Sequence, residues 1–404
     1  MEDEQSAELF FIKKELDMQR LKKVQTADVS VYHVFEEGDN RFRGVASVQV
    51  QDSLTQPEME KLFADAYYAA GFVKNKYYDL YEGTKVGMVQ AKDPFGEKTL
   101  NEMVQGFAQA LFAEDVYKEV FINSAEIFAS RLTVHIRNSR GVDVSYNRSR
   151  VQGEFVVQCT SGQDVETYQD FSYNGWNLDA IREKARNTIE LTRARARATT
   201  APAAGEYRLI LSGGYVNEFM SYYVNRASSF AIYQKYSTFS AGCDVQGGEV
   251  SKDRVNMTMK SNVPFSDEGI PMKNRELVKD GKLMMIHGGN RFARYLGIAP
   301  TGNFDGYKVE AGNVSIEQMK EQPYLEVVNF SDFQMDWFTG HFGGEIRLAF
   351  LYDGKTLTPV TGGSVNGNIF EAQKSLVFSK EMQVEKDFEG PKAVAMDGVS
   401  VAGI

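Results

Sequence analysis

The chain has 404 residues, 43% hydrophobic and 25% charged, with a formal net charge of −10. One hydrophobic core usually stops growing at roughly 250–300 residues, so this length favours two or three domains. The negative charge argues against broad nucleic-acid binding, which depends on Lys and Arg neutralising phosphates. No segment approaches the ~20 consecutive apolar residues of a membrane span, so we expect no membrane crossing.

The N-terminal sequence and the cysteine count indicate a cellular compartment. The first residues, MEDEQSAELFFIKKELDMQR, are acidic and carry a short apolar patch, whereas a signal peptide begins with basic residues and continues with a longer apolar stretch. The cysteines are sparse, at Cys159 and Cys243, which is typical of a reducing compartment. These features predict a cytoplasmic protein.

The first third of the chain contains one predicted hairpin and two predicted helices. Strand-like runs at 29–35 and 45–50 flank turn residues at 38–40. One helix is expected after Thr55, which has capping-box spacing to Glu58, and Gly71 is a possible C-cap of this helix. A second helix is expected after Thr99, which has the same spacing to Glu102.

From Arg131 the pattern changes to short β runs. The segments RLTVHIR, VDVSY and EFVVQCT, with a turn at 138–141, predict an antiparallel meander. Asn177 is expected to begin a long helix that ends near a linker at 199–205. The basic residues of this helix either form a local phosphate-binding face or complement the dipole of a solvated helix end; they are Arg182, Lys184, Arg186, Arg193, Arg195 and Arg197.

The second half is predicted to be mostly β, after a possible helix from Tyr215 to Tyr233. Its clearest hairpin is GEIRLAFLYDGKTLTPV, with the turn at Asp353–Gly354. The sequence therefore predicts an α+β fold: an N-terminal mixed α/β region followed by a β-rich, mostly antiparallel C-terminal domain. The expected boundaries are 1–118, 119–204 for the meander and long helix, and 205–404.

Local motifs for catalysis are weak. None of the histidines, His33, His135, His287 and His341, lies within one helical turn of another or of a cysteine. Nucleophile-elbow and phosphate-loop motifs are lacking as well. The acid pair at 267–268 could perform acid–base chemistry, but a solvated turn is the favoured interpretation.

Several segments of the chain, taken in order, resemble the TldD/PmbA family, once called modulators of DNA gyrase and now associated with metallopeptidase activity on unfolded peptides. The resemblance covers about residues 120–404, and residues 1–90 match weakly. It rests on the Asn-Ser-x-Gly turn at 138–141 and on the segments DEGIP, LVKDGKLMMIHGGNRFARYLGIAPTGN, FTGHF, LYDGKTLTPVTGGSVNGNIFEA and VSVAGI.

The resemblance also identifies a departure from the family pattern. Catalytic members carry a His-Glu-x-x-x-His helix and a cysteine near the C-terminus, which together hold a zinc-like metal. Here the similar helix places Asn217 and Tyr222 at the histidine positions and keeps Glu218, and no cysteine follows Cys243. An amide and a phenol with a pKa of about 10 are poor zinc ligands, so no catalytic or metal residue is assigned and these three are candidates for a vestigial site.

The resemblance therefore implies a non-catalytic subunit similar to TldE/PmbA. It would pair with a TldD-like metallopeptidase subunit, which would carry the metal, to process unfolded peptides. One alternative is a stand-alone homodimer that binds a peptide or another ligand without peptidase activity. Another is an enzyme with unconventional ligands drawn from His287, His341 and nearby carboxylates.

Overall fold

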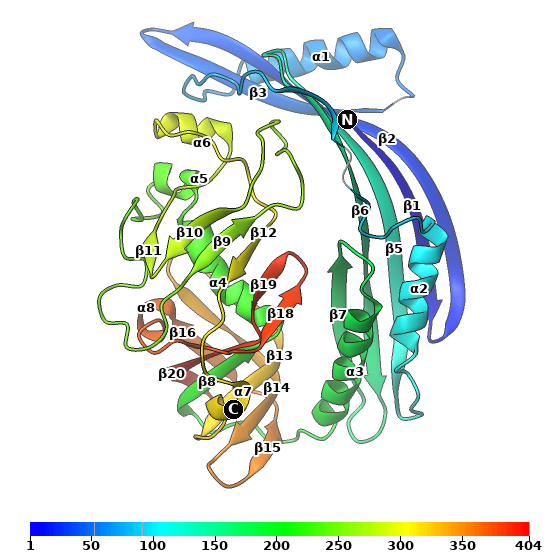
Figure 1. Ribbon diagram of the computed structural model, residues 1–404, viewed down its shortest axis with the longest axis vertical. Helices are drawn as coiled ribbons and strands as arrows, with labels where there is room; N and C mark the ends of the chain where they lie inside the picture. Colours follow the sequence, from blue (N-terminus) through cyan, green and yellow to red (C-terminus); the bar gives the residue numbers. More distant parts are fainter. Residues whose placement is uncertain (52, 90–91, 404) are drawn as a thin grey trace.

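The computed structural model describes residues 1–51, 53–89 and 92–403, and it has an α+β fold (Figure 1). The described residues form three sheets, in which most neighbouring strands are antiparallel. One sheet belongs to the N-terminal half and two belong to the C-terminal half, as expected from the β-rich pattern after residue 205.

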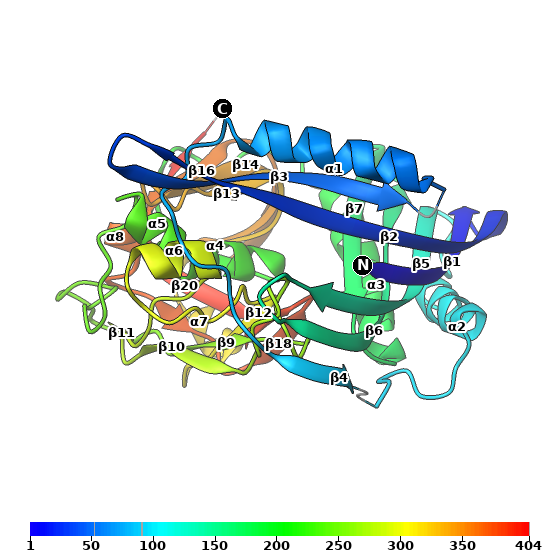
Figure 2. The ribbon, with the colours of Figure 1, turned by 90° about the horizontal axis from the view of Figure 1, so that it is seen from above.

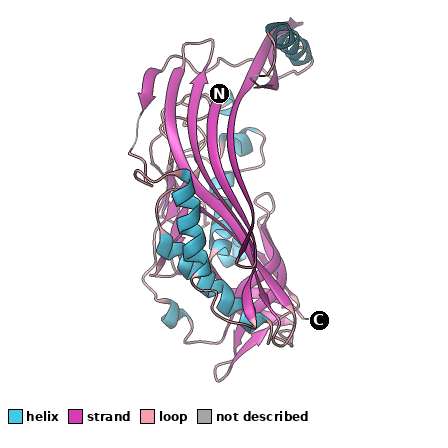
Figure 3. Ribbon diagram, turned by 90° about the vertical axis from the view of Figure 1, so that its right-hand side faces the viewer, coloured by secondary structure: helices cyan, strands magenta, loops and turns pink. Residues whose placement is uncertain are grey.

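The N-terminal sheet is long and curved (Figure 3). Its described strands follow the order β3-β2-β1-β5-β6-β4, and β7 also pairs with β6. The bounds are β1 Glu2–Ile12, β2 Glu15–Glu37, β3 Asn40–Gln51, β4 Lys85–Val89, β5 Val120–Arg137, β6 Asp143–Cys159 and β7 Val165–Tyr173.

Three helices cover this sheet. Helix α1 (Gln56–Ala70) lies along β2 and β3 (Figure 2), whereas α2 (Leu100–Phe112) and α3 (Leu178–Arg195) pack together on β1, β5, β6 and β7. Both predicted capping boxes are present, and Asn177 caps α3 by accepting the backbone N–H of Ala180. These helix starts are therefore confirmed.

The N-terminal sheet joins segments that are far apart in the sequence. Strand β1 pairs with β2 on one side and with β5 on the other, so the predicted segments 1–118 and 119–204 share one sheet and one core. The core includes Phe107, Leu111, Ile127 and Phe155, all fully buried.

Two expectations for this half need correction. The sequence pattern predicted no strand before Val29, yet β1 and the first half of β2 occupy most of that stretch. The pattern also separated VDVSY from EFVVQCT, which belong to the continuous strand β6. Gly153 allows this continuity, because a Cβ there would lie 2.0 Å from the carbonyl oxygen of Glu126 on β5.

The C-terminal half contains the other two sheets. One has the order β11-β10-β9-β12-β19-β18; the other has the order β13-β8-β20-β16-β14-β15, and β13 also pairs with β14, which closes five strands into a ring. Their bounds are β8 Gly205–Ser212, β9 Met257–Lys260, β10 Arg275–Lys279, β11 Lys282–Leu283, β12 Gly306–Val309, β13 Tyr324–Met335, β14 His341–Tyr352, β15 Leu357–Val360, β16 Ser364–Asn368, β17 Val377–Phe378, β18 Met382–Glu385, β19 Phe388–Pro391 and β20 Ala393–Ala402.

Short helices pack around these strands. The helix expected over 215–233 is split in two, because Ser228 starts a new helix by accepting the backbone N–H of Ala231. None of the helices in the described ranges combines the length and the apolar character that crossing a bilayer requires. The bounds are α4 Gly214–Arg226, α5 Ser229–Tyr233, α6 Asn290–Tyr295, α7 Ile316–Met319 and α8 Ile369–Ala372.

The two halves contact each other at the β18–β19 hairpin, which lies beside α3 and β7 (Figure 1). Lys184 of α3 pairs with Glu385 at 2.8 Å, and Lys386 pairs with Asp170 of β7 at 2.6 Å. Arg186 of α3 also pairs with Glu114, so several basic residues of this helix form ion pairs within the protein. This arrangement does not support a phosphate-binding face there.

Candidate functional site

Helix α4 carries the three residues at the positions where the family's metal-binding motif is expected. Gly213 precedes it with a φ of 63°, a conformation that favours glycine. Val216, Phe219, Met220 and Tyr223 then recur at helical spacing and are fully buried in the C-terminal core. This stripe fixes the rotation of α4 and therefore the direction of its remaining side chains.

Asn217 lies against a tyrosine. The hydroxyl of Tyr307 on β12 is 2.6 Å from both the backbone carbonyl oxygen and the side-chain oxygen of Asn217. Burial, and after it the nearby charge of Glu218, raise the pKa of Tyr307 well above its ordinary value, so its hydroxyl stays protonated and donates. The amide oxygen of Asn217 is therefore already used.

Glu218 and Tyr222 point in different directions. Glu218 is exposed, whereas Tyr222 is only 1% exposed and packs edge-on against Tyr223, Phe239 and Phe370. Burial raises the pKa of Tyr222, and its hydroxyl has no hydrogen-bond partner among the described residues. A buried, protonated phenol in an aromatic cluster is a poor metal ligand.

These residues do not fit the zinc-like metal that the family pattern implies. Positions 217 and 222 are five apart, which on a regular α-helix places them about 140° out of phase. Their side chains have separate partners, and no group of three His, Cys, Asp or Glu side chains is placed to hold a metal in the part of the chain that the structure describes. Helix α4 therefore supports no chemical step that runs through a metal.

The unconventional ligand set is not assembled either. His287 is buried, and its Nε2 lies 2.9 Å from the carbonyl oxygen of Val224 in the last turn of α4. Burial lowers the pKa of His287, so it is neutral and completes the end of the helix. His341 is exposed at the start of β14. The described carboxylates form no metal-binding group with either histidine.

The acid pair at 267–268 is not a simple solvated turn, and this corrects the favoured interpretation. Asp267 is exposed, but Glu268 is half-buried, and its Oε2 accepts the backbone N–H of Asn290 at 2.6 Å. Burial, with a smaller contribution from Asp267, raises the pKa of Glu268. Its charge also acts on Tyr32 and Tyr78 of the N-terminal half, so Glu268 lies where the two halves meet.

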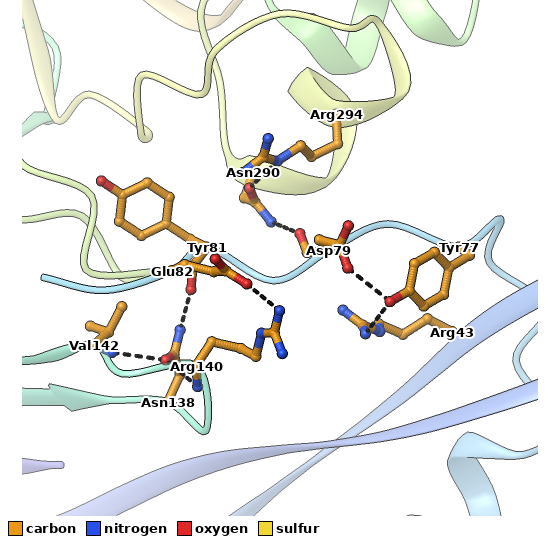
Figure 4. A network of polar contacts seen from close by, with 10 residues as sticks. All are labelled: Arg43, Tyr77, Asp79, Tyr81, Glu82, Asn138, Arg140, Val142, Asn290 and Arg294. Carbon is orange, nitrogen blue, oxygen red and sulfur yellow. Dashed lines mark hydrogen bonds and ion pairs between the residues drawn. The ribbon is translucent and has the colours of Figure 1, made fainter.

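The segment 75–82 connects the two halves through a polar network (Figure 4). Asn290 of α6 donates its side-chain amide to the carbonyl oxygen of Asp79 at 2.7 Å, and Asn138 donates to the carbonyl oxygen of Tyr81 at 2.8 Å. Asn138 also accepts the backbone N–H of Val142, which closes the predicted turn. The Asn-Ser-x-Gly turn therefore holds this connecting segment in place.

A cleft of about 400 Å³ lies between the N-terminal sheet and the C-terminal half. Its C-terminal side includes Asn262, Val263 and Asp305, and most of the rest comes from β1, β5 and β6. The volume is within the usual range for ligand sites, ~300–1,000 Å³. The lining carries charges of both signs, from Lys92, Arg131, Arg148 and Arg150 and from Asp3, Asp93 and Asp305.

Hydrogen bonds fix several side chains of the cleft. Arg131 pairs with Asp93 at 2.9 Å, and Ser149 donates to the same carboxylate at 3.1 Å. Asn174 and Asn262, from opposite sides, donate to Asp387 of the β18–β19 turn at 3.1 and 2.9 Å. Amide, hydroxyl and charged groups of this kind can bind the main chain and the termini of an extended polar ligand.

Sequence reasoning did not find this cleft. Its residues come from segments as far apart as Asp3 and Asp305, and the turn residue Asp387 ties its two sides together. No local motif marks them, because each residue looks like an ordinary polar residue of a strand or a turn. The placement of the α4 residues could be predicted, but not their partners.

Comparisons with known proteins agree with the fold and the motifs. Residues 204–403 match the sequence model of the PmbA/TldA metallopeptidase C-terminal domain. A protein named as a metalloprotease from Archaeoglobus fulgidus is 22% identical over 312 residues, which covers 69% of this chain and 70% of that protein. The chain therefore belongs to the TldD/PmbA family.

Solved structures are similar along nearly the whole chain. TldE from Thermococcus kodakarensis superposes with a TM-score of 0.77 at 14% identity, covering 100% of this chain and 95% of that one. A candidate modulator of a DNA gyrase from Thermotoga maritima gives a TM-score of 0.76 at 16% identity, with 99% and 94% covered. These likenesses show that the fold extends to the N-terminal half, where the sequence resemblance was weak.

Proposed function

We propose that this chain is a non-catalytic subunit of a metallopeptidase complex of the TldD/TldE type, and that the complex processes unfolded peptides in the cytoplasm. The observation that carries the proposal is the state of α4. Asn217 is hydrogen-bonded to Tyr307, and Tyr222 is packed among aromatic rings. Helix α4 therefore does not present a set of ligands for a zinc-like metal. The metal would be carried by a TldD-like partner.

The cleft between the two halves would supply a wall of the peptide chamber. Its donors and acceptors come from several strands, and its charges have both signs. Such a lining can hold the main chain of many sequences, because every peptide presents the same amide groups. This property suits a complex that acts on unfolded chains.

The proposal can be tested with the chain purified from its own cells and examined by native mass spectrometry. We expect a heteromer in which the metal stays with the companion subunit. The isolated chain, supplied with zinc and an unfolded polypeptide, should cleave nothing, and addition of the companion should restore cleavage. Metal bound stoichiometrically by this chain alone would contradict the proposal.

Glu218 gives a sharper test in the reconstituted complex. Without a metal nearby it has no polarised water to deprotonate, so Glu218→Gln should change the cleavage rate by no more than a few fold. The matched control is the same change at the metal-associated glutamate of the companion, which should abolish cleavage. A loss of hundreds of fold from Glu218→Gln would assign the chemistry to this chain.

A second candidate function is a homodimer that binds a peptide or another ligand without peptidase activity. The observation that favours it is a cleft of about 400 Å³ that is lined from both halves of the chain and carries charges of both signs. A metal-free homodimer in the native mass spectrum, with unfolded peptide bound and no companion, would support this function instead. One similar structure is described as a modulator of a DNA gyrase. An acidic chain is poorly suited to binding DNA, so any such effect of this chain would have to be indirect.

A further inference from the structure

The cleft between the two halves lies where the edge of β6 changes its partner strand. Residues 143–146 of β6 pair with β4, and residues 151–159 pair with β7. Residues 147–150 fall between these two stretches, and all of them line the cleft. In the described ranges no strand pairs with 147–150 on this edge, since β5 occupies the other edge. The cleft therefore contains backbone N–H and C=O groups that a ligand can bind.

Three cations of the cleft are available to a ligand. Lys92 and Arg150 form no ion pair with any described residue, and Arg148 reaches only one oxygen of Glu2, at 3.9 Å. Arg148 and Arg150 are two positions apart on β6, so their side chains lie on the same face of the sheet, about 7 Å apart along the strand. Two guanidinium groups at this spacing can bind one carboxylate between them.

Two carboxylates of the cleft also lack a cation. Asp3 of β1 and Asp305 of the C-terminal half form no ion pair with any described residue, and the Oδ1 atom of Asp3 is shielded from solvent without a hydrogen-bond partner among those residues. Asp305 accepts the backbone N–H of Asn262. Desolvation and, less strongly, the charge of Asp387 raise the pKa of Asp305. A cationic group of a ligand beside these carboxylates offsets the cost of their desolvation.

We infer that the cleft binds a short peptide by both of its free termini. The α-ammonium group of the peptide lies at Asp3 and Asp305, and its α-carboxylate lies at Arg148 and Arg150. The amides between the two ends face the open backbone of 147–150. The volume of about 400 Å³ suits a drug-sized ligand, which corresponds to a peptide of about three residues.

Other ligands match these groups less well. An internal segment of a long polypeptide has neither terminus, so it brings no charge to either set of side chains. A nucleic acid or another anion satisfies the arginines but is repelled by Asp3 and Asp305. A free amino acid carries both charges but has no amide that could pair with 147–150. A short peptide supplies all three kinds of group.

A short peptide with two free ends is what a peptidase releases, so the source of this ligand rests on the proposed function. The cleft would retain cleavage products of many sequences and would not select uncut chains. The unpaired charges and the open stretch of β6, in contrast, belong to this chain alone. Binding can therefore be measured on the isolated full-length chain, without a companion subunit.

The first experiment is isothermal titration calorimetry of the full chain with trialanine. We expect a dissociation constant below about 1 mM, and acetylation of the N-terminus or amidation of the C-terminus should each weaken binding about tenfold or more. This series uses only the wild-type chain, so it does not depend on the folding of a variant. No binding of trialanine at about 10 mM, or equal affinity for the free and blocked peptides, would overturn the inference.

Two double variants assign the termini to their partners. Asp3→Asn with Asp305→Asn should remove the preference for a free N-terminus and keep the preference for a free C-terminus. Arg148→Gln with Arg150→Gln should do the reverse. Arg182→Gln, on the exposed surface of α3, is the control and should keep both preferences. If each double variant keeps both preferences, the termini do not bind at these side chains.

The result for the cleft can be separated from the result for the subunit. Cleavage by the complex with its companion, without measurable binding of trialanine to this chain, would refute the peptide in the cleft and leave the subunit proposal standing. Binding of trialanine by a chain that purifies as a metal-free homodimer would support the cleft and refute the subunit proposal.

Discussion

The hydroxyl of Tyr307 and the side-chain oxygen of Asn217 are 2.6 Å apart, although 90 residues separate them in the sequence. This contact ties α4 to β12 at the position where the family pattern would place a histidine. Because burial raises the pKa of Tyr307 well above its ordinary value, the hydroxyl is protonated and can donate at neutral pH. Asn217 therefore has a structural role in this chain.

Removing that donor should cost stability. Tyr307→Phe removes the donor to the partly buried side-chain oxygen of Asn217, and we expect the free energy of unfolding to fall by about 1 kcal/mol. Urea denaturation at pH 7 measures the change. Tyr168→Phe is the control, because Tyr168 donates to Glu154 at the surface and should cost less than about 0.5 kcal/mol. Equal losses of stability in the two variants would mean that the hydrogen bond of Tyr307 contributes no more than a surface hydrogen bond.

Glu268 should make stability depend on pH in an uncommon direction. Its pKa is higher in the folded chain than in the unfolded chain, so the folded state binds its proton more tightly and gains stability as the pH falls. Glu268→Gln cannot take up that proton. The unfolding free energy of the wild type minus that of Glu268→Gln should therefore increase between pH 7 and pH 4.

Glu58 supplies a control with the opposite sign. Its carboxylate accepts the backbone N–H and hydroxyl of Thr55, and these hydrogen bonds lower its pKa. Its contribution is present at neutral pH and is lost as the pH falls through the folded pKa. The difference between wild type and Glu58→Gln should thus shrink on acidification. If the stability difference between wild type and Glu268→Gln also shrinks on acidification, the burial of Glu268 is refuted.

Asp387 should govern the motion of the β18–β19 hairpin. Asp387→Ala removes the acceptor shared by Asn174 and Asn262, and we expect amide hydrogen exchange over 382–391 to become about tenfold faster or more. Asp353→Ala is a matched change in the β14–β15 turn, where Asp353 accepts two backbone N–H groups. It should affect only its own turn. Unchanged exchange at 382–391 would mean that the ion pairs to α3 and β7 and the pairing of β19 with β12 hold the hairpin without Asp387.

The two cysteines should differ in reactivity. Cys159 is completely buried in the N-terminal core, whereas Cys243 is partly exposed in a loop. A thiol reagent should label Cys243 at least tenfold faster in the native protein, because access limits the reaction of a buried thiol. Mass spectrometry of proteolytic fragments identifies the labelled residue, and guanidinium at a denaturing concentration should abolish the difference. Fast labelling of Cys159 would indicate opening of the N-terminal core.

Local signals predicted the elements that have local causes. Thr99 and Glu102 form the expected capping box, and the Asp353 turn joins β14 to β15 as expected. The β1–β2 hairpin was missed because its turn at Lys13 and Lys14 has no glycine, asparagine or proline, although Lys13 adopts a φ of 55°. The exposed, mixed composition of residues 15–25 of β2 gave no strand signal either.

The candidate site was predictable only in part. The rotation of α4 follows from its apolar stripe, so the separation of Asn217 from Tyr222 could be expected from the helical repeat. The hydrogen bond from Tyr307 to Asn217 and the buried position of Glu268 could not be predicted, because each depends on a strand or helix that is distant in sequence. The cleft was inaccessible to sequence reasoning for the same reason.

The central position of β1 has a consequence for synthesis on the ribosome. Ala7 pairs with Leu21, which follows at once, but also with Ala129, which is made much later. At ~5–20 residues per second, the nascent chain waits roughly ten seconds with that second edge of β1 unsatisfied. During this interval β1 is exposed to encounters with other chains unless a chaperone covers it. Cooler growth, which slows such encounters, should therefore raise the yield of native protein.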